Sequence, residues 1–306
     1  MSFQRRAEAA QLTEWVDEKP SVTNSTRTSR PRGTLETASR QQDHLRTIIV
    51  HYHIFKNAGS SVDRLLHTAF GSGWTSFEGP TPTSLLRADD LATFIKDRPE
   101  IVAVSSHLLR PPSPPSVRVL PVVLIRHPLD RAFSVYSYLR RHPDGAATGT
   151  VAQQTSFPQF VLWCLNNKTL GGMVIANYQV IHLSPASFRH AHIYHAVATE
   201  NDLQHAIHYL SDTACFGTVD LFDATVDRLR QAAAAFDLDI PTLIAAENVT
   251  PDRSDDLNER LHTARRQLGP HLYRRYMNEN ELDYRLYKWA HRETKLQAAP
   301  SATLPR

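Results

Sequence analysis

The feature that most constrains the fold is a run of β-branched and aromatic residues that leads directly into a loop of small residues. Residues 47–55 read Thr-Ile-Ile-Val-His-Tyr-His-Ile-Phe, which predicts a buried strand. A helix is expected next, because apolar residues recur at helical spacing over residues 62–69 and Gly71 follows them. Ser60 or Ser61 is expected to cap the start of this helix.

The same alternation continues along the chain. Strands are predicted over four further segments, residues 101–105, 119–125, 192–197 and 215–219. Helices are predicted over residues 129–139 and 200–210, and over most of the chain from residue 221 onward. Strands that alternate with helices imply an α/β fold, in which helices cover both faces of a parallel sheet. The C-terminal part is expected to be helical.

Composition predicts one domain with a tail at each end. Residues 1–44 contain a Ser/Thr/Arg/Pro-rich stretch at 20–33 that is poor in apolar side chains, so this tail is expected to be disordered or weakly ordered. Residues 45–295 form the predicted domain. Residues 296–306 are expected to form a disordered C-terminal tail.

Charge and cysteine content exclude several classes of protein. Lys and Arg number 34 against 31 Asp and Glu, a formal net charge of +3 that gives no reason to expect a nucleic-acid partner. Cys164 and Cys215 form no Cys-x-x-Cys pair, which argues against a zinc knuckle or a disulfide framework. No apolar run approaches the roughly 18 residues of a membrane span, and the N-terminus lacks a signal-peptide core. We therefore expect a cytoplasmic protein.

The segment Phe-Lys-Asn-Ala-Gly-Ser-Ser, residues 55–61, is the first motif that carries chemistry. It lies where a strand passes into a helix, so its amides, the helix N-terminus, a lysine and two hydroxyls are able to cradle a phosphate. This predicts a P-loop-like sheet. The loop is not the nucleotide-kinase pattern Gly-x-x-x-x-Gly-Lys-Ser/Thr, because Lys56 precedes Gly59. Taken alone, the default interpretation of this loop is an ordinary strand-to-helix turn with a surface lysine.

The second motif follows the predicted strand at 119–125. Arg126 ends that strand, and Arg131 and Ser134 are three residues apart on the next helix. An arginine donates two parallel hydrogen bonds to a phosphate, and a serine adds a third. The alternative is that Arg131 pairs with Asp130 or another acid and that Ser134 has no role.

Together the two motifs resemble those of the sulfotransferases that use 3′-phosphoadenosine 5′-phosphosulfate (PAPS), in the carbohydrate branch that includes the heparan and uronyl 2-O-sulfotransferases. Their first motif is similar to His-x-Pro-Lys-Thr-Gly-Gly-Thr-Ser, against His-Ile-Phe-Lys-Asn-Ala-Gly-Ser-Ser at 53–61. Their second is similar to Arg-Asp-Pro-x-x-Arg-x-x-Ser-x-Tyr, against Arg-His-Pro-Leu-Asp-Arg-Ala-Phe-Ser-Val-Tyr at 126–136. Weaker similarity extends the match to residues 47–292.

Three departures from the family pattern bear on the site. Phe55 replaces a proline, and Asn57 and Ala58 replace Thr-Gly, which changes the shape of the loop and its donors. His127 replaces the acid that follows the arginine, and an imidazole does not accept hydrogen bonds as a carboxylate does.

The resemblance implies a donor site with PAPS as the sulfuryl donor. The cradle for its 5′-phosphosulfate would be formed by Lys56, Asn57, Ala58, Gly59, Ser60 and Ser61. Arg126 and Ser134 would hold the 3′-phosphate, which distinguishes this donor from ATP. Lys56 would also stabilise the charge that develops on the leaving oxygen, so no metal is required.

His107 follows the predicted strand at 101–105 and is the expected general base, as the resemblance also implies. The acceptor would be a hydroxyl of a carbohydrate or glycosylated small molecule. Arginines at 110, 118, 140 and 141 either bind an acidic acceptor or form a solvated rim. His51 and His53 share one face of their strand, but no metal site is expected because the sequence shows no third ligand. Two alternatives are a catalytically silent nucleotide-binding module and an ATP-dependent phosphotransferase.

Overall fold

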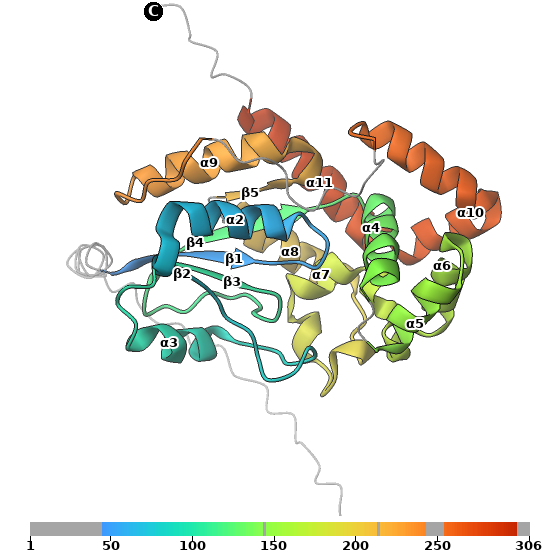
Figure 1. The fold of residues 1–306 in the computed structure, drawn as a ribbon, viewed down its shortest axis with the longest axis horizontal. Coiled ribbons are helices and arrows are strands. Elements are labelled where there is room, and N and C mark those ends of the chain that lie inside the picture. Colours follow the sequence, from blue (N-terminus) through green and yellow to red (C-terminus); the bar gives the residue numbers. More distant parts are fainter. Residues whose placement is uncertain (1–44, 143–144, 213–214, 243–253, 299–306) are drawn as a thin grey trace, which may run out of the picture. The chain divides into compact units, whose positions relative to one another are not determined.

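The computed structural model describes residues 45–142, 145–212, 215–242 and 254–298, and its centre is a five-stranded parallel sheet (Figure 1). The strand order is β2-β3-β1-β4-β5. The strands are β1 (Thr47–Tyr52), β2 (Trp74–Ser76), β3 (Ala103–Ser106), β4 (Arg118–Ile125) and β5 (Cys215–Thr218). The predicted parallel α/β sheet is therefore confirmed.

The register places three strands so that their last residues reach one edge of the sheet. Val50 of β1 pairs with Val104 of β3 on one side and with Pro121 of β4 on the other. All pairings are parallel, so the segments that follow β3, β1 and β4 emerge side by side. This carboxyl edge is where α/β sheets place their ligands.

Helices cover both faces of the sheet, as expected. On one face, α2 (Gly59–Phe70) and α9 (Phe222–Ala234) pack against residues such as Ile49 and Val122. On the other face, Ile48 and Val50 contact a second set of helices. These are α3 (Ala88–Lys96), α7 (Tyr178–His182), α8 (Glu200–Ser211) and α11 (Glu281–Ala298). Alternate residues of β1 thus enter different apolar clusters, as the two-residue repeat of a strand requires.

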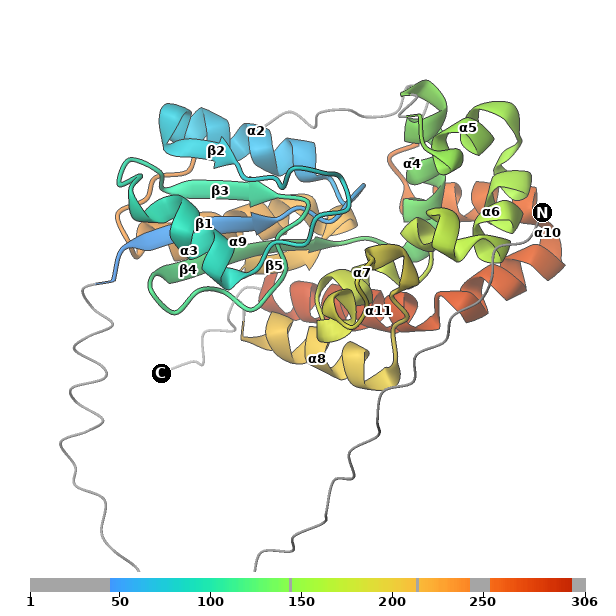
Figure 2. The same cartoon turned by 90° about the horizontal axis from the view of Figure 1, so that it is seen from below.

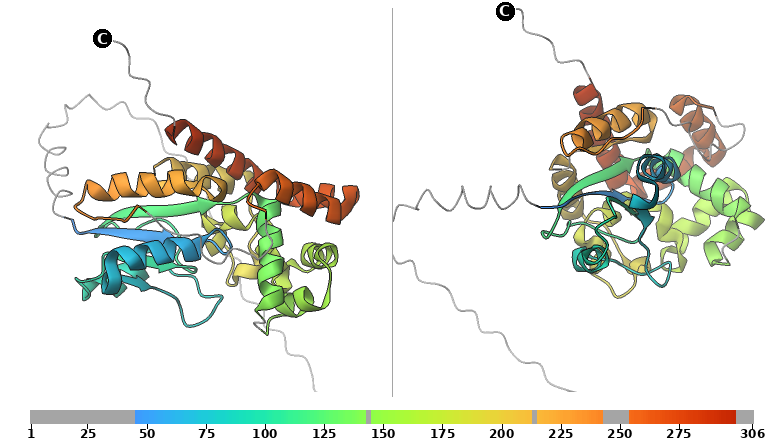
Figure 3. Two further views of the ribbon diagram at one scale, coloured as in Figure 1. Left: turned by 45° about the horizontal axis from the view of Figure 1, so that its top comes forward. Right: turned by 60° about the vertical axis from the view of Figure 1, so that its left-hand side comes forward.

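A separate helical group lies beyond the tips of the strands (Figures 2 and 3). It consists of α4 (Pro128–Arg141), α5 (Ala147–Gln154), α6 (Phe157–Asn166) and α10 (Leu257–Glu279). These helices share one apolar cluster that includes Val135, Phe160 and Tyr276. Since the strands point toward this group, it forms one wall of the space at the carboxyl edge. The helical C-terminal part is confirmed by α9, α10 and α11.

The strand predicted at 192–197 is wrong. Ile193–His195 form a short 3₁₀ helix, and the His192 side chain accepts a hydrogen bond from the amide of Tyr194 at its start. Ile193 is buried in a small cluster with Met173 and Ile181, away from the sheet. The apolar alternation of this segment therefore reflects packing in a connection, not strand pairing.

The predicted cap of α2 is also wrong. Ala58, in the left-handed conformation, precedes the helix, and Ser60 and Ser61 both lie inside its first turn. Gly71 ends the helix at positive φ, as expected. The sequence patterns missed β2, α3, α5, α6 and α7.

The predicted N-terminal tail at 1–44 lies outside the described residues. Helix α11 continues through Ala298, three residues into the predicted C-terminal tail, and the remainder of that tail also lies outside them. No helix within the described ranges has the length and apolar character needed to cross a membrane.

Candidate active site

Three segments that the sequence singled out meet at the carboxyl edge of the sheet. The loop that carries Lys56 follows β1, His107 follows β3, and Arg126 follows β4. The guanidinium Nη1 of Arg126 donates to the carbonyl oxygen of Lys56 at 2.9 Å. The ring of His107 stacks on that of His53, with centroids 3.7 Å apart. The two sequence motifs and the candidate base therefore belong to one site.

The loop before α2 has an unusual backbone. Lys56 and Ala58 have φ values of 66° and 60°, in the left-handed region that non-glycine residues seldom adopt. The amide of Asn57 donates to the carbonyl of Ile54 at 3.0 Å, and that of Ser61 donates to Ala58 at 3.1 Å. The amides of Asn57 and Ser61, two residues of the predicted phosphate cradle, are thus used inside the loop. Those of Gly59 and Ser60 lie in the first helical turn, where no intrahelical acceptor exists.

The side chain of Asn57 points into the protein. It is 2% exposed, and its Nδ2 donates to the carbonyl of Leu124 and to Oε1 of Gln179, each at 2.7 Å. The departure from the family pattern at this position therefore has a structural role. Asn57 fastens the loop to β4 and α7.

Gln179 is a site residue whose role the sequence did not reveal. Its Oε1 also accepts from the amide of Arg126 at 2.8 Å, and its Nε2 donates to the carbonyl of Arg126 at 2.9 Å. Asp283 holds Gln179 in turn, accepting from its amide at 3.1 Å and from Nε2 at 3.2 Å. This buried amide therefore connects the loop after β1, the end of β4 and α11.

Arg126 is fixed on two sides. Its Nε donates to Asp130 at 2.7 Å, and both side chains are buried. Asp130 also accepts from Nε of Arg260 on α10 at 2.9 Å. Among the described residues no partner is found for Nη2 of Arg126, which is the end of the guanidinium left for a ligand.

Among the described residues Arg131 forms no ion pair with Asp130 or another acid, so that part of the alternative is wrong. It is 2% exposed and donates to the carbonyls of Phe55 at 3.0 Å and Val174 at 2.8 Å. Arg131 thus links the loop at Phe55 to the segment that contains Val174 by hydrogen bonds. Ser134 is half-buried on α4, and its hydroxyl bonds to none of the described residues.

The side chain of Lys56 crosses to α4. Its Nζ lies 4.3 Å from the centre of the Tyr138 ring, a cation–π contact. Phe55 packs edge-on against the same ring. This aromatic contact directs the lysine toward the edge where α4 faces the loop.

His107 is held by an acid that the sequence did not reveal. Glu78 Oε1 lies 2.9 Å from both the backbone nitrogen and the Nδ1 of His107. A carboxylate at Nδ1 favours a proton there, which leaves Nε2 as the basic nitrogen. The His107 side chain is 44% exposed, so that nitrogen is accessible to a ligand.

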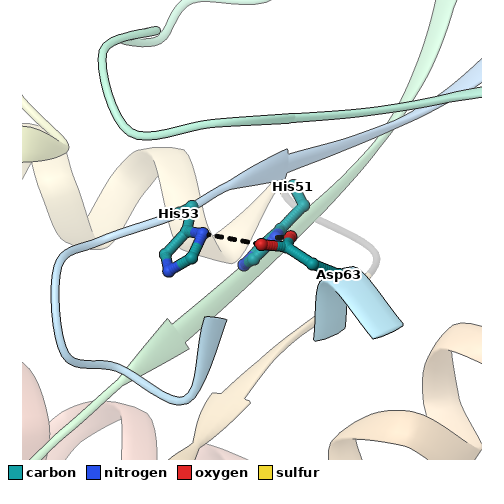
Figure 4. Close-up of side chains that lie close together, drawn as sticks. All are labelled: His51, His53 and Asp63. Carbon is teal, nitrogen blue, oxygen red and sulfur yellow. Dashed lines mark hydrogen bonds and ion pairs between the residues drawn. The ribbon is translucent and has the colours of Figure 1, made fainter. Parts of the chain in front are cut away.

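The buried His51 and His53 form a cluster with the half-buried Asp63 on the α2 side of β1 (Figure 4). The Nδ1 of His51 lies 2.8 Å from one Asp63 oxygen, and the Nδ1 of His53 lies 3.1 Å from the other. The sequence argument that no third ligand exists is therefore wrong in its premise. One ligand atom from each of the three residues lies within 4.8 Å of the other two, so the cluster could hold a metal ion, and the absence of a metal site stays a prediction.

Burial sets the charge of His53, and the two neighbouring imidazoles set the charge of Asp63. Burial lowers the pKa of His53 to about 4, so its imidazole is neutral at physiological pH. Burial alone would raise the pKa of Asp63, but the two imidazoles beside it hold that pKa well below its ordinary value. The neutral ring of His53 thus forms a fixed surface between Gly59 and His107. A Cβ at Gly59 would lie 1.8 Å from its Nε2, so only glycine fits there.

A cavity of about 490 Å³ opens beside His107, within the size range of small-molecule sites. The residues that line it include Phe55, Glu78, His107, Leu139, Val174 and Tyr178. Arg110 also lines it, although this guanidinium is only 2% exposed. Arg110 Nη1 donates to the carbonyl of His107 at 2.8 Å, and its Nε has no partner among the described residues.

His127 replaces a carboxylate in the family pattern, and its structural role is now visible. It precedes α4, and its Nδ1 accepts from the amide of Leu129 at 3.2 Å. Burial lowers the pKa of His127 to about 4, which keeps the ring neutral and able to accept. The imidazole therefore caps the helix that carries Arg131 and Ser134.

Comparison with known proteins assigns no function to this site. No model of a known protein family matches the chain. It is 26% identical over 251 residues to an uncharacterized protein of Archaeoglobus fulgidus, and the match covers 79% of this chain and 95% of that protein. The chain therefore shares most of its length with a protein from an archaeon, and the function is argued from the geometry of the site.

Proposed function

We propose that this protein is a PAPS-dependent sulfotransferase with a P-loop-like donor site, acting on a hydroxyl of a carbohydrate or glycosylated small molecule. The supporting observation is the hydrogen bond from Arg126 to the carbonyl of Lys56. It joins the two motifs of the family resemblance, which are 70 residues apart in the chain.

In the proposed reaction the acceptor oxygen attacks sulfur, and the bond between sulfur and the 5′-phosphate oxygen breaks. The acceptor proton goes to Nε2 of His107, and the products are a sulfate ester and 3′-phosphoadenosine 5′-phosphate (PAP). Negative charge grows on the departing phosphate oxygen, and the ammonium of Lys56 stabilises it. The residues needed are a base, a cation and donors for the phosphates.

The donor would lie across the loop and the start of α4. The amides of Gly59 and Ser60, with both serine hydroxyls, supply donors at a helix N-terminus, where an anion is favoured. The Nη2 of Arg126 and the hydroxyl of Ser134 would bind the 3′-phosphate. Asn57 and Gln179 hold these groups in place and do not contact the donor in this proposal.

The cavity beside His107 is the proposed acceptor site. It places an accessible imidazole next to Phe55, the residue before Lys56. Its lining mixes apolar side chains with hydroxyls from Thr81, Thr83 and Ser84. Such a mixture suits a sugar, whose ring has apolar faces and hydroxyl edges.

Donor recognition is the first test. A thermal-shift titration compares PAP with ADP and ATP, since a ligand at about 100 times its Kd adds about 2.7 kcal/mol to the folded state. We expect selective stabilisation by PAP. Equal stabilisation by ATP would favour the phosphotransferase, and no stabilisation by any of them would exclude the donor site.

Turnover is the second test. The protein is incubated with ³⁵S-labelled PAPS and a panel of 4-nitrophenyl glycosides, and labelled sulfate ester is measured. His107→Ala is expected to abolish transfer while PAP still binds, and Lys56→Ala is expected to abolish transfer as well. PAP binding without transfer to any glycoside or to water would favour a silent module. Full turnover in His107→Ala would show that another group is the base.

A further inference from the structure

We propose that Glu78 is the positioning residue for His107, so that the two side chains act as a carboxylate–imidazole pair in the transfer step. This inference rests on the proposed function, because it assigns a partner to the proposed base. Glu78 contacts His107 and has no assigned contact with the donor. The resulting pair lies at the wall of the acceptor cavity.

Two hydrogen-bond contacts hold Glu78 and His107 together. One oxygen of Glu78 lies 2.9 Å from both Nδ1 and the backbone nitrogen of His107. The amide fixes the carboxylate relative to the main chain, and the carboxylate then fixes the ring. The face of the ring stacks on the buried His53 at 3.7 Å, so rotation about the side-chain bonds of His107 is also restricted.

The loop that carries Glu78 is anchored at both ends to the segment that carries His107. The amide of Phe77 donates to the carbonyl of Ser105 at 2.9 Å, which extends the pairing of β2 with β3. The amide of Leu86 donates to the carbonyl of Leu108 at 3.0 Å. The two residues are 29 positions apart, yet their relative placement follows from these two backbone hydrogen bonds.

The interior of the loop limits its movement. Gly79 packs so closely on Ser84 that a Cβ at Gly79 would lie 2.4 Å from the Ser84 Cβ. Phe77 stacks on Phe94 of α3, with ring centroids 4.5 Å apart. Glu78 itself is exposed, but close contacts on either side of it restrain the loop that carries it.

This arrangement gives Glu78 two effects on proton transfer. By accepting a hydrogen bond from the Nδ1–H group, Glu78 keeps the proton on Nδ1 and leaves Nε2 unprotonated and directed away from the acid. When Nε2 takes the acceptor proton, the carboxylate stabilises the imidazolium cation that forms. A geometry of base plus orienting carboxylate is the general arrangement that activates a hydroxyl nucleophile.

The kinetic test compares Glu78→Gln and Glu78→Ala with the wild type on the best glycoside. Glu78→Gln keeps an oxygen for the His107 amide but removes the charge. We expect both variants to lower kcat roughly 10- to 100-fold, less than the about 10²- to 10⁴-fold that the general base itself contributes. The KM for the donor and the affinity for PAP should stay within about twofold of wild type. The matched control is Glu100→Gln, which changes an exposed acid and should leave kcat unchanged.

A spectroscopic test needs no turnover. Imidazole ¹⁵N shifts of the full chain report the tautomer of each histidine, and the signals of His107 are those lost in His107→Ala. We expect wild-type His107 to be protonated at Nδ1, and Glu78→Ala to give a mixture of tautomers.

The kinetic and ¹⁵N measurements distinguish a failure of the positioning role of Glu78 from a failure of the proposed sulfotransferase function. A wild-type enzyme that transfers sulfuryl, with unchanged kcat in Glu78→Gln and Glu78→Ala, would overturn the positioning role and leave the proposed function intact. A His107 tautomer that Glu78→Ala does not change would also overturn the positioning role. The expected tautomer change in a chain that binds no PAP would instead support the Glu78–His107 pairing and overturn the donor assignment.

Discussion

Arg126 donates from Nη1 to the carbonyl oxygen of Lys56, and the same guanidinium donates from Nε to Asp130. The side chain therefore connects the loop after β1 to the first turn of α4. A carbonyl held in this way fixes the backbone of a lysine that has positive φ. Arg126 is therefore one of the side chains that hold the loop, together with Asn57 and Arg131, and it is also the residue proposed to bind the 3′-phosphate.

The first prediction concerns Arg126→Ala. We expect the variant to lose at least tenfold in affinity for PAP, because the charge-assisted contact of the guanidinium, through Nη2, with the 3′-phosphate is lost. Affinity for ADP, which has no 3′-phosphate, should change less, and calorimetric titration with both nucleotides measures the difference. The control is Arg260→Ala, which removes the other ion pair of Asp130 without a contact to Lys56. Equal losses for PAP and ADP would contradict the assignment.

The second prediction concerns Gln179→Leu. The substitution keeps the approximate volume but leaves the buried amide of Arg126 and one donor of Asn57 without an acceptor. An unsatisfied buried group costs about 1–3 kcal/mol, so we expect the free energy of unfolding to fall by about 2–4 kcal/mol. Urea denaturation measures it. Gln204→Leu, at an exposed position of α8, should change stability by about 0.5 kcal/mol or less. A similar small change in Gln179→Leu would show that the loop does not depend on this amide.

The third prediction concerns the contact between Gly59 and His53. A Cβ at position 59 would overlap the imidazole, so Gly59→Ala is expected to destabilise the protein by about 1–3 kcal/mol and to weaken PAP binding. His53→Ala removes the obstacle. In a double-mutant cycle, the cost of Gly59→Ala should therefore be smaller in the His53→Ala background, with a coupling of about 0.5–3 kcal/mol. Additive losses would mean that the ring moves aside without cost.

Local patterns in the sequence were sufficient to predict the strands and helices that carry the site. The strand and helix on either side of Lys56, and the helix that begins at Pro128, were predictable because apolar spacing and a proline act within a few residues. The alternation of strands and helices was sufficient to predict that the sheet is parallel. The carboxyl edge then follows from the direction of the strands.

The residues that hold the site together were not predictable in this way. Gln179 meets Asn57 across 122 residues, and Glu78 meets His107 across 29, so neither contact has a local pattern. The prediction failed at 192–197 for a related reason. Ile193 is buried by a small cluster of connecting segments, which gives the same alternation as a strand.

The fourth prediction concerns the helix cap at His127. The pKa of this buried imidazole is lowered to about 4 from an ordinary value near 6.5, so the unfolded chain binds the proton more tightly. The stabilisation by neutral His127 is therefore complete above about pH 6.5 and is lost as the pH falls toward about 4. His127→Asn does not titrate, and asparagine is a good helix cap.

At pH 7.5 we expect the free energy of unfolding of His127→Asn to be within about 1 kcal/mol of wild type. At pH 5 we expect it to rise by about 2 kcal/mol relative to wild type. This pH lies about 1.5 units below the ordinary histidine pKa, and each unit corresponds to about 1.36 kcal/mol. Urea denaturation at the two pH values measures this change. His127→Ala separates the cap from the titration, because it should show the same pH dependence but lie about 1 kcal/mol below His127→Asn at both pH values. If the difference between wild type and His127→Asn is the same at pH 7.5 and pH 5, the ring is not held neutral, and the hydrogen bond from Leu129 is not what fixes the start of α4.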